Sequence, residues 1–370
     1  YSKNNQSGNM ATSSINYQLS SLSSTQQSVT WRSPSNIAIV KYWGKHGVQL
    51  PRNPSVSFTL DAAYTDTTVS FTEKSEKDGE VSIDFYFEGA PNEAFASKIT
   101  AFLESLHVEF NFLLDYNLKI ESSNSFPHSS GIASSASAMS ALALCLCSIE
   151  KILTGWPTDG TDFLNKASHI ARLGSGSATR SVFPEVAIWG THRNIEGSTD
   201  LQAIPFDSQL HKSFKSFHDD ILIVSADEKS VSSRAGHSLM EVNPYATVRY
   251  EQANKNMMAT LEALKTGDIL SFGKILEEEA MTLHALMMCS DPSYILMKAG
   301  TLAVIEKVRA FREETSLPLY FTLDAGPNVH LLYPDEVEDQ IWPFIERELV
   351  PHCVDGKVIR DRVGSGPRLI

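Results

Sequence analysis

A loop rich in serine and glycine, followed directly by a long apolar helical pattern, constrains the fold of this chain more than any other feature. The loop reads NSFPHSSGIASSAS over residues 124–137. Beyond it, apolar side chains recur at the three- and four-residue spacing of a helix, at Ile132, Ala136, Met139, Ala143, Leu146 and Ile149. The pattern predicts a loop of small residues that opens a buried core helix.

Small residues at the start of a helix allow several backbone N–H groups to point at one position, where the positive end of the helix also favours an anion. Further donors are the hydroxyl groups of Ser129, Ser130, Ser134 and Ser135, one of which could bind Mg²⁺. The loop matches neither the Walker pattern nor G-x-G-x-x-G. It therefore indicates a phosphate site of another type, with a serine-rich helix cap as the alternative.

The composition is typical of a soluble globular protein. Of 370 residues, 42% are hydrophobic and 20% are charged, which excludes collagen, coiled coil and wholesale disorder and suggests about two domains. The formal net charge of −13 is unfavourable for nucleic-acid binding, so an anionic substrate would need local lysine and arginine residues. The scattered cysteines indicate neither a disulfide framework nor a metal site; they are Cys145, Cys147, Cys289 and Cys353.

No segment predicts membrane insertion or export. The longest apolar stretch, Ala136 to Ile149, is too short to span a bilayer. The N-terminus lacks a basic region followed by an apolar core, so we expect no signal peptide, with Met10 as the natural start. Together with the cysteine pattern, this favours a cytoplasmic protein.

The order of local patterns predicts two α+β domains rather than a strict βαβ repeat. Residues 1–29 are rich in polar side chains, so we expect a flexible N-terminal segment, followed by domains at 30–205 and 206–370. Apolar periodicity predicts strands at 35–40, 56–60, 67–71, 81–87, 117–121, 186–190, 221–225, 317–323 and 329–333. It predicts further helices at 93–106, 161–173, 245–265, 268–288, 293–314 and 336–349.

Two further motifs place cations next to glycine and hydroxyl side chains. In KYWGK, at residues 41–45, the glycine favours a loop that brings two ammonium groups near phosphate or carboxylate oxygens. In GSGSATR, at residues 174–180, the hydroxyl groups and Arg180 suit a dianion or a carboxylate, which a guanidinium binds bidentately. Solvated lysines and a flexible connection with a surface arginine are the alternatives.

Two polar turns complete the candidate set. Asp324, in the run DAGPN at the end of an apolar strand, could be a catalytic base or a metal ligand, or could hydrogen-bond within its own turn. Residues 232–234, SSR, form a polar loop with a basic end. Each motif alone is ambiguous, and their combination along the chain is the stronger signal.

In this order the motifs resemble those of the GHMP kinase superfamily and, within it, the diphosphomevalonate decarboxylase family. The resemblance rests on NIAIVKYWGK at 36–45, PHSSGIASSASA at 127–138, ARLGSGSATRS at 171–181 and LDAGPN at 323–328. It implies an α+β, two-domain GHMP kinase fold. The N-terminal domain would resemble domain 2 of ribosomal protein S5, the C-terminal domain would be a ferredoxin-like α/β sandwich, and the active site would lie in the cleft between them.

The resemblance also implies a reaction that uses ATP and Mg²⁺. ATP would phosphorylate the 3-hydroxyl of mevalonate 5-diphosphate, and loss of phosphate and CO₂ would give isopentenyl diphosphate for isoprenoid biosynthesis. Asp324 would act as base for the hydroxyl, and Arg180 would hold the C1 carboxylate. The family is often homodimeric, which implies a homodimer here.

The matching positions imply three sets of site residues. The catalytic set is Asp324, Arg180, Lys41, Asn36 and Ser233. The substrate-binding set is Tyr42, Lys45, Ser175, Ser177, Arg180 and Arg234. The ATP-binding set is Ser129, Ser130, Gly131, Ala133, Ser134, Ser135 and Lys229, with Mg²⁺ at Ser134 and Ser135.

Alternatives to this reaction remain open from the sequence. The chain departs from the usual family pattern at the loop PHSSG, at Pro54 and at His237, although it keeps the catalytic set. A decarboxylase of mevalonate 5-monophosphate would share the base and the arginine but bind fewer anionic oxygens. A plain small-molecule kinase would release ADP without CO₂, and a non-catalytic binding protein on this fold would typically have lost the base or the phosphate loop.

Overall fold

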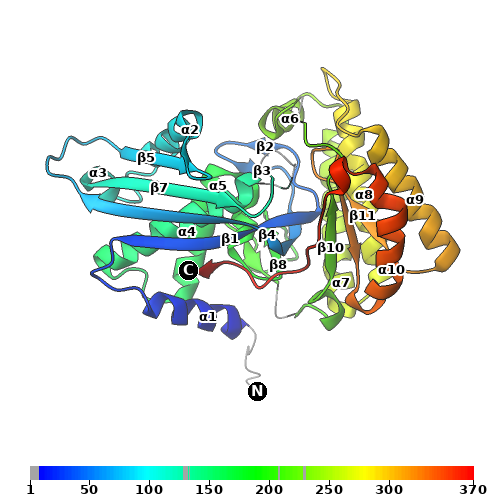
Figure 1. Cartoon of the computed structure of the whole chain (residues 1–370), viewed down its shortest axis with the longest axis horizontal. Helices are drawn as coiled ribbons and strands as arrows, with labels where there is room; N and C mark the ends of the chain where they lie inside the picture. Colours follow the sequence, from blue (N-terminus) through cyan, green and yellow to red (C-terminus); the bar gives the residue numbers. More distant parts are fainter. Residues whose placement is uncertain (1–7, 128–131, 133, 207–208, 228–230) are drawn as a thin grey trace.

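The computed structural model describes residues 8–127, 132, 134–206, 209–227 and 231–370. Within these residues the chain forms two halves side by side, each with its own β-sheet and its own packed helices (Figure 1). The N-terminal half is built on a sheet of eight strands and the C-terminal half on a sheet of four. This is the mixed α+β architecture that the irregular order of strands and helices predicts.

Two long strands, β1 (Ser28–Val40) and β4 (Ser55–Glu73), form the centre of the N-terminal sheet. The strand order is β14-β1-β4-β7-β5-β6, with β8 paired to β4 and β9 paired to β8. The other strands are β5 (Ser82–Phe87), β6 (Ala90–Pro91), β7 (Tyr116–Asn124), β8 (Val186–Trp189), β9 (Ile204–Pro205) and β14 (Arg368–Leu369), and a separate hairpin pairs β2 (Lys45–His46) with β3 (Leu50–Pro51). The helices of this half are α1 (Gly8–Ser20), α2 (Glu93–Glu104), α3 (Phe112–Asp115), α4 (Ser134–Thr154) and α5 (Gly160–Gly174).

Helix α4 is the buried helix that the pattern after the serine-rich loop predicts. Its apolar side chains pack against alternate residues of β4, among them Val69 and Phe71. In length and composition it could cross a membrane, but 67% of its most apolar window is buried inside the protein. Its apolar character is therefore explained by the core.

The C-terminal sheet is covered by helices on both faces. Its order is β11-β12-β10-β13, and Ile221 of β10 packs towards α7 and α8 while the neighbouring Leu222 packs towards α9 and α10. Because both faces are covered, all five residues of β10 are buried. The strands are β10 (His218–Leu222), β11 (Tyr320–Thr322), β12 (Val329–Tyr333) and β13 (Val358–Ile359); the helices are α6 (Ser233–Leu239), α7 (Ala246–Thr266), α8 (Ile269–Met288), α9 (Ala299–Thr315) and α10 (Glu338–Phe344).

A shared apolar core joins the two halves. Phe58, from the first part of β4, lies with its ring centroid 5.6 Å from that of Phe272 on α8, and Phe214 and Phe217 pack beside them. The C-terminal segment also crosses back to the first half, where β14 pairs with β1 (Figure 1). The last residues of the segment 206–370 thus belong to the N-terminal sheet. Together with the shared core, this strand pairing fixes the position of one half relative to the other.

Three local predictions are wrong. The segment 1–29 is not wholly flexible, because α1 buries Ile15 and Leu19 and β1 already begins at Ser28. The strands expected at 56–60 and 67–71 are one strand, β4, because the backbone N–H groups of residues 61–63, between them, donate to the carboxylate of Asp361. The helix expected from residue 293 begins only at Ala299, where the Thr301 hydroxyl accepts a bond from the backbone N–H of Lys298.

Candidate active site

A cleft of about 300 Å³ lies between the two halves and collects most of the motif residues. Its walls come from the end of β1, the start of α4, the turn after α5, the start of α6 and the turn between β11 and β12. The predicted site residues that line it are Asn36, Lys41, Tyr42, Lys45, Ser135, Ser175, Ser177, Arg180, Ser233, Arg234 and Asp324. Segments nearly 300 residues apart in the chain thus meet in one cavity, as in the Lys41–Asp324 contact.

Lys41 and Asp324 form an ion pair in the cleft wall. Lys41 follows β1 directly and is only 2% exposed, whereas Asp324, in the turn after β11, is 24% exposed; Nζ lies 3.2 Å from Oδ1. Burial lowers the pKa of Lys41, and the charge of Asp324 opposes that shift. The pair therefore presents a carboxylate to the cleft while its ammonium partner is held out of water.

Arg180 also lines the cleft, and its side chain is held in a fixed orientation. It sits on a short 3₁₀ helix, Gly176–Val182, where its Nε donates to Ser57 Oγ (3.0 Å) and its Nη1 donates to Ser55 Oγ (2.7 Å). Its Nη2 donates to Asn36 Oδ1 (3.2 Å), and Asn36 is itself anchored because its Nδ2 donates to Ser181 Oγ (2.7 Å). Burial lowers the pKa of Arg180 to about 10, with the charge of Asp324 opposing the shift, so the guanidinium stays charged at neutral pH.

The loop that carries Tyr42 and Lys45 forms one end of the cleft. The Tyr42 hydroxyl is buried and has no hydrogen-bond partner within the described part of the chain. Burial lowers the pKa of Lys45, and the charge of Arg234 lowers it further. A buried hydroxyl in a cleft that also contains Lys45 and Arg234 is suited to a multiply charged oxyanion, which would supply the missing partner.

His237 holds this loop in place. Its Nδ1 accepts a bond from the backbone N–H of Gly44 (3.0 Å), and its ring lies between Tyr42 and Trp43, at 4.3 and 4.5 Å between centroids. Burial and the charge of Lys45 lower the pKa of His237 to about 3, so the ring is neutral. The histidine that departs from the family pattern therefore lines the cleft without adding charge.

The expected phosphate loop is only partly described. Ser135 is exposed in the cleft, and its Oγ lies 3.1 Å from Ser175 Oγ. Ser134 begins α4 but is not among the residues that line the cleft. Five predicted ATP-binding residues lie outside the described residues, namely Ser129, Ser130, Gly131, Ala133 and Lys229.

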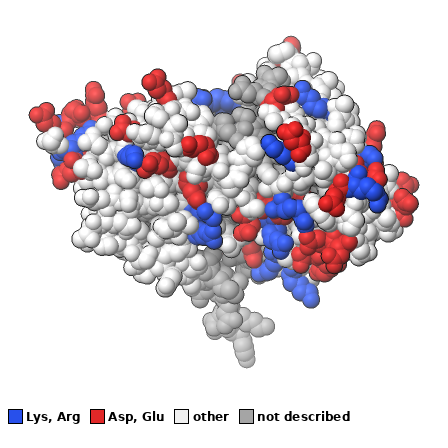
Figure 2. Space-filling model, viewed as in Figure 1, with Lys and Arg blue, Asp and Glu red and all other residues white. Residues whose placement is uncertain are grey.

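The cleft is positive although the whole chain is acidic. Among the described residues, its lining includes Lys41, Lys45, Arg180 and Arg234 but a single carboxylate, Asp324. On the viewed outer face, acidic and basic side chains are intermixed on both halves (Figure 2). The local excess of cations is the feature that an anionic substrate would need in a protein with a net charge of −13.

Several residues that support the cleft walls are not predicted by the sequence patterns. Ser55 and Ser57 stand two apart on β4 and so share one face, which was a usable signal. Glu279 and Arg249 are charged residues buried within helical patterns, but their partners lie far away in sequence. No local pattern identifies which residue such a charge will contact.

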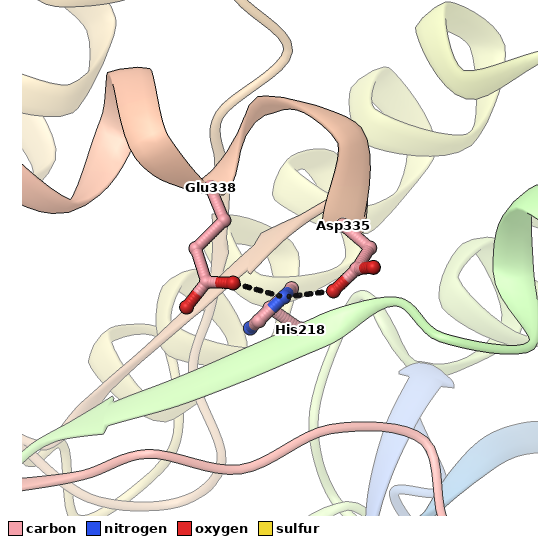
Figure 3. Close-up of side chains that lie close together, drawn as sticks. All are labelled: His218, Asp335 and Glu338. Carbon is pink, nitrogen blue, oxygen red and sulfur yellow. Dashed lines mark hydrogen bonds and ion pairs between the residues drawn. The ribbon is translucent and has the colours of Figure 1, made fainter.

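A second cluster of titratable side chains lies outside this cleft. His218 Nε2 lies 2.8 Å from Asp335 Oδ1 and 3.6 Å from Glu338 Oε2 (Figure 3). Arg360 also pairs with Glu338, and Arg362 approaches Asp335. Because the two guanidinium groups already balance the carboxylates, this cluster is an ion-pair network that ties the C-terminal segment to β10 and α10.

Comparison with protein families matches both halves of the chain. Residues 33–201 match the diphosphomevalonate decarboxylase-like N-terminal domain, and residues 220–369 match the mevalonate 5-diphosphate decarboxylase C-terminal domain. A diphosphomevalonate decarboxylase from Ganoderma lucidum is 31% identical over 333 residues, which cover 85% of this chain and 80% of the relative.

Solved structures give the same result. Mevalonate diphosphate decarboxylase from Staphylococcus aureus is 27% identical with a TM-score of 0.79, covering 93% of this chain and 98% of that one. A structure described as MDDEF in complex with MVAPP, AMPPCP and magnesium is 30% identical with a TM-score of 0.77, covering 93% and 99%. The similarity thus extends through both halves and the cleft between them.

Proposed function

Because the chain belongs to the diphosphomevalonate decarboxylase family, we propose that its cleft catalyses the ATP-dependent decarboxylation of mevalonate 5-diphosphate to isopentenyl diphosphate. The observation that carries this proposal is the meeting of Asp324, Lys41 and Arg180 in one positive cleft. A related protein that had lost its catalytic activity would not be expected to keep both a carboxylate and a guanidinium in the lining of one cleft.

The reaction needs two consecutive steps. In the first, the 3-hydroxyl oxygen bonds to the γ-phosphorus of ATP, the bond from that phosphorus to the β–γ bridging oxygen breaks, and ADP leaves. The hydroxyl loses its proton, which Asp324 accepts or orients. In the second, the C3–O bond to phosphate breaks while the C1–C2 bond releases CO₂, and its electron pair forms the C2–C3 double bond. Both steps depend mainly on positioning and on balancing negative charge.

The cations of the cleft have separate roles in this scheme. Lys41, paired with Asp324, is placed to offset charge on the migrating phosphoryl group. Arg180, which Asn36 orients, holds the C1 carboxylate. Ser233, at the start of α6, approaches the transferred phosphate from the C-terminal half.

The 5-diphosphate is bound at the end of the cleft formed by the KYWGK loop. Tyr42, Lys45 and Arg234 all line the cleft, and the Tyr42 hydroxyl, which has no hydrogen-bond partner among the described residues, supports this assignment. Ser175 and Ser177 also line the cleft and add hydroxyl groups.

ATP and Mg²⁺ are the expected cosubstrate and metal, since a related structure holds AMPPCP and magnesium. The hydroxyl oxygens of Ser135 and Ser175 at the mouth of the cleft are hard donors of the kind that Mg²⁺ accepts. Ser135 would hold the ion from the cleft lining, whereas Ser134, the other residue that the resemblance implies for Mg²⁺, does not line the cleft. When bound, the ion would neutralise charge on the phosphates. The remaining loop residues proposed for ATP are Ser129, Ser130, Gly131, Ala133 and Lys229.

Turnover of two candidate substrates tests the function directly. With mevalonate 5-diphosphate and ATP we expect one ADP and one CO₂ per turnover, measured in parallel coupled assays. With mevalonate 5-monophosphate we expect a much lower kcat/KM, because Lys45 and Arg234 would lose ionic partners. Preference for the monophosphate, ADP without CO₂, or no turnover of either compound would each contradict the proposal.

Chelation of divalent cations should abolish turnover. With EDTA present we expect the rates of ADP and CO₂ release to fall together to background, because the phosphoryl transfer loses its charge neutralisation. Adding back excess Mg²⁺ should restore both rates. Full activity in EDTA would remove the metal from the mechanism.

We also propose a cellular location, an oligomeric state and a pair of domain boundaries. A cytoplasmic location is supported by the four cysteines, all described and all free. A homodimer follows from the family resemblance and is checked by light scattering of the purified chain. A division into domains at residues 30–205 and 206–370 is checked by limited proteolysis.

A further inference from the structure

Helix α8 contributes Leu283 to the cleft lining and contacts the backbone of both Lys41 and Asp324. The carboxylate of Glu279, which is fully buried, accepts a bond from the backbone N–H of Lys41 (2.8 Å). Five residues further along the same helix, His284 Nε2 lies 3.0 Å from the backbone oxygen of Asp324. Because a carbonyl oxygen can only accept, this nitrogen is the donor.

The Lys41 backbone is held from more than one side. Its carbonyl oxygen accepts bonds from Arg249 Nη2 (3.0 Å) and from Asn53 Nδ2 (2.9 Å). Arg249 in turn forms a buried ion pair with Glu279 through both of its terminal nitrogens. Residue 41 therefore has little freedom to move while this network is intact.

Glu279 is the centre of the network because its carboxylate faces only donors. Its Oε2 meets the Lys41 N–H and one Arg249 nitrogen, and its Oε1 meets the other Arg249 nitrogen and Asn256 Nδ2 (2.7 Å). A glutamine in this place would turn an NH₂ group towards donors in either orientation. The site thus requires an ionised carboxylate rather than a side chain of similar shape.

Lys41 and Asp324 come from different halves of the chain, and α8 contacts each of them. We propose that Glu279 and His284 are positioning residues that hold Lys41 and Asp324 at the separation needed for phosphoryl transfer. Neither residue touches the substrate in this scheme. The inference rests on the proposed function, because it assigns to α8 the support of that reaction's ion pair.

The matched control lies on the same helix. Glu277 is also buried and ion-paired, but its oxygens bind Arg312 on α9 (2.7 and 2.9 Å), away from the cleft. Glu279→Gln and Glu277→Gln therefore each remove one buried charge from α8. A general loss of stability should affect both variants, whereas loss of positioning should affect the first alone.

We expect Glu279→Gln to reduce kcat by roughly 10–100-fold, since a small displacement of a reacting group is enough for such a loss. KM for mevalonate 5-diphosphate should change little, because the diphosphate is bound at the other end of the cleft. Glu277→Gln should keep its kcat within about twofold. His284→Leu should lose activity in the same way, and His284→Gln, which retains an N–H donor, should recover most of it.

The dependence of kcat on pH is a measurement that a change in stability alone would not alter. The charged groups that face Lys41 are Asp324 in the β11–β12 turn, Glu279 on α8 and Asp219 on β10, and each raises the pKa of Lys41 against the effect of burial. Removing the charge of Glu279 lowers that pKa. The alkaline limb of kcat should therefore move to lower pH in Glu279→Gln and stay in place in Glu277→Gln.

Each outcome of this experiment is decisive. Equal kcat and equal pH profiles in Glu279→Gln and Glu277→Gln would overturn the inference, as would equal activity in His284→Leu and His284→Gln. If circular dichroism shows that Glu279→Gln does not fold, the His284 pair decides alone. A wild-type enzyme that releases no CO₂ in the same assay would refute the proposed function rather than the positioning role.

Discussion

Replacing Asp324 by Asn should lower kcat by roughly 10²–10⁴-fold, the range expected for losing a general base. The amide has nearly the same shape as the carboxylate but can neither accept the hydroxyl proton nor balance the charge of Lys41, whose Nζ lies 3.2 Å away. The affinity for ATP should change far less, because the nucleotide is expected at the serine-rich loop. Rates of ADP and CO₂ release should fall together, since phosphorylation precedes elimination.

The matched control for this variant is Asp335→Asn. Asp335 is an ion-paired aspartate of the same half, next to His218 and at the opposite end of β12 from Asp324. We expect its substitution to lower Tm modestly and to leave kcat unchanged. Rapid-quench measurement of ADP and a nucleotide-binding titration are the two assays. Full turnover in Asp324→Asn would exclude this residue as the base.

Replacing Arg180 by Lys should reduce kcat by roughly 10²–10³-fold, as for the loss of a preorganised donor at a reacting group. A lysine keeps a charge but cannot make the three contacts to Ser57, Ser55 and Asn36 that orient the guanidinium. Burial lowers the pKa of Arg180 only to about 10, whereas a lysine in the same surroundings would lose its proton at lower pH. The defect should therefore deepen as the pH rises.

The assay for this variant compares CO₂ with ADP. Because Arg180 is assigned to the carboxylate that leaves, CO₂ release should fall at least as much as ADP release. Arg312→Lys is the control, since Arg312 is a partly buried arginine that binds Glu277 outside the cleft. An Arg180→Lys enzyme with normal CO₂ release would separate the guanidinium from the decarboxylation step.

The elements with strong periodicity could be predicted closely. The helix expected at 268–288 is α8, Ile269–Met288, and the strand expected at 329–333 is β12, Val329–Tyr333. The predicted boundaries of a strand or helix were wrong where tertiary contacts determine its ends. β4 continues through residues 61–63 because their backbone N–H groups bind the carboxylate of Asp361, which lies 300 residues from Asp61.

The candidate site likewise contains residues that the sequence could predict and residues that it could not. The local motifs supplied Lys41, Arg180 and Asp324 as candidates, each with a structural alternative. The order of these motifs along the chain, which resembles that of the family, is what selected the three residues together. The sequence could not reveal that Ser55 and Ser57 orient Arg180. It also could not reveal that His237 holds the loop after Lys41, because its partner Gly44 is 193 residues away.

The kinds of elements, the family resemblance and the available chemical groups can be read from local stretches of the chain, since these depend on neighbours within a turn or a strand. Which groups face one another depends on how the chain packs in three dimensions. The Lys41–Glu279 bond joins residues 238 positions apart, and the Lys41–Asp324 pair joins residues 283 apart. Such contacts form because packing of the shared core closes the two halves around the cleft, and no local pattern in the chain encodes that distance.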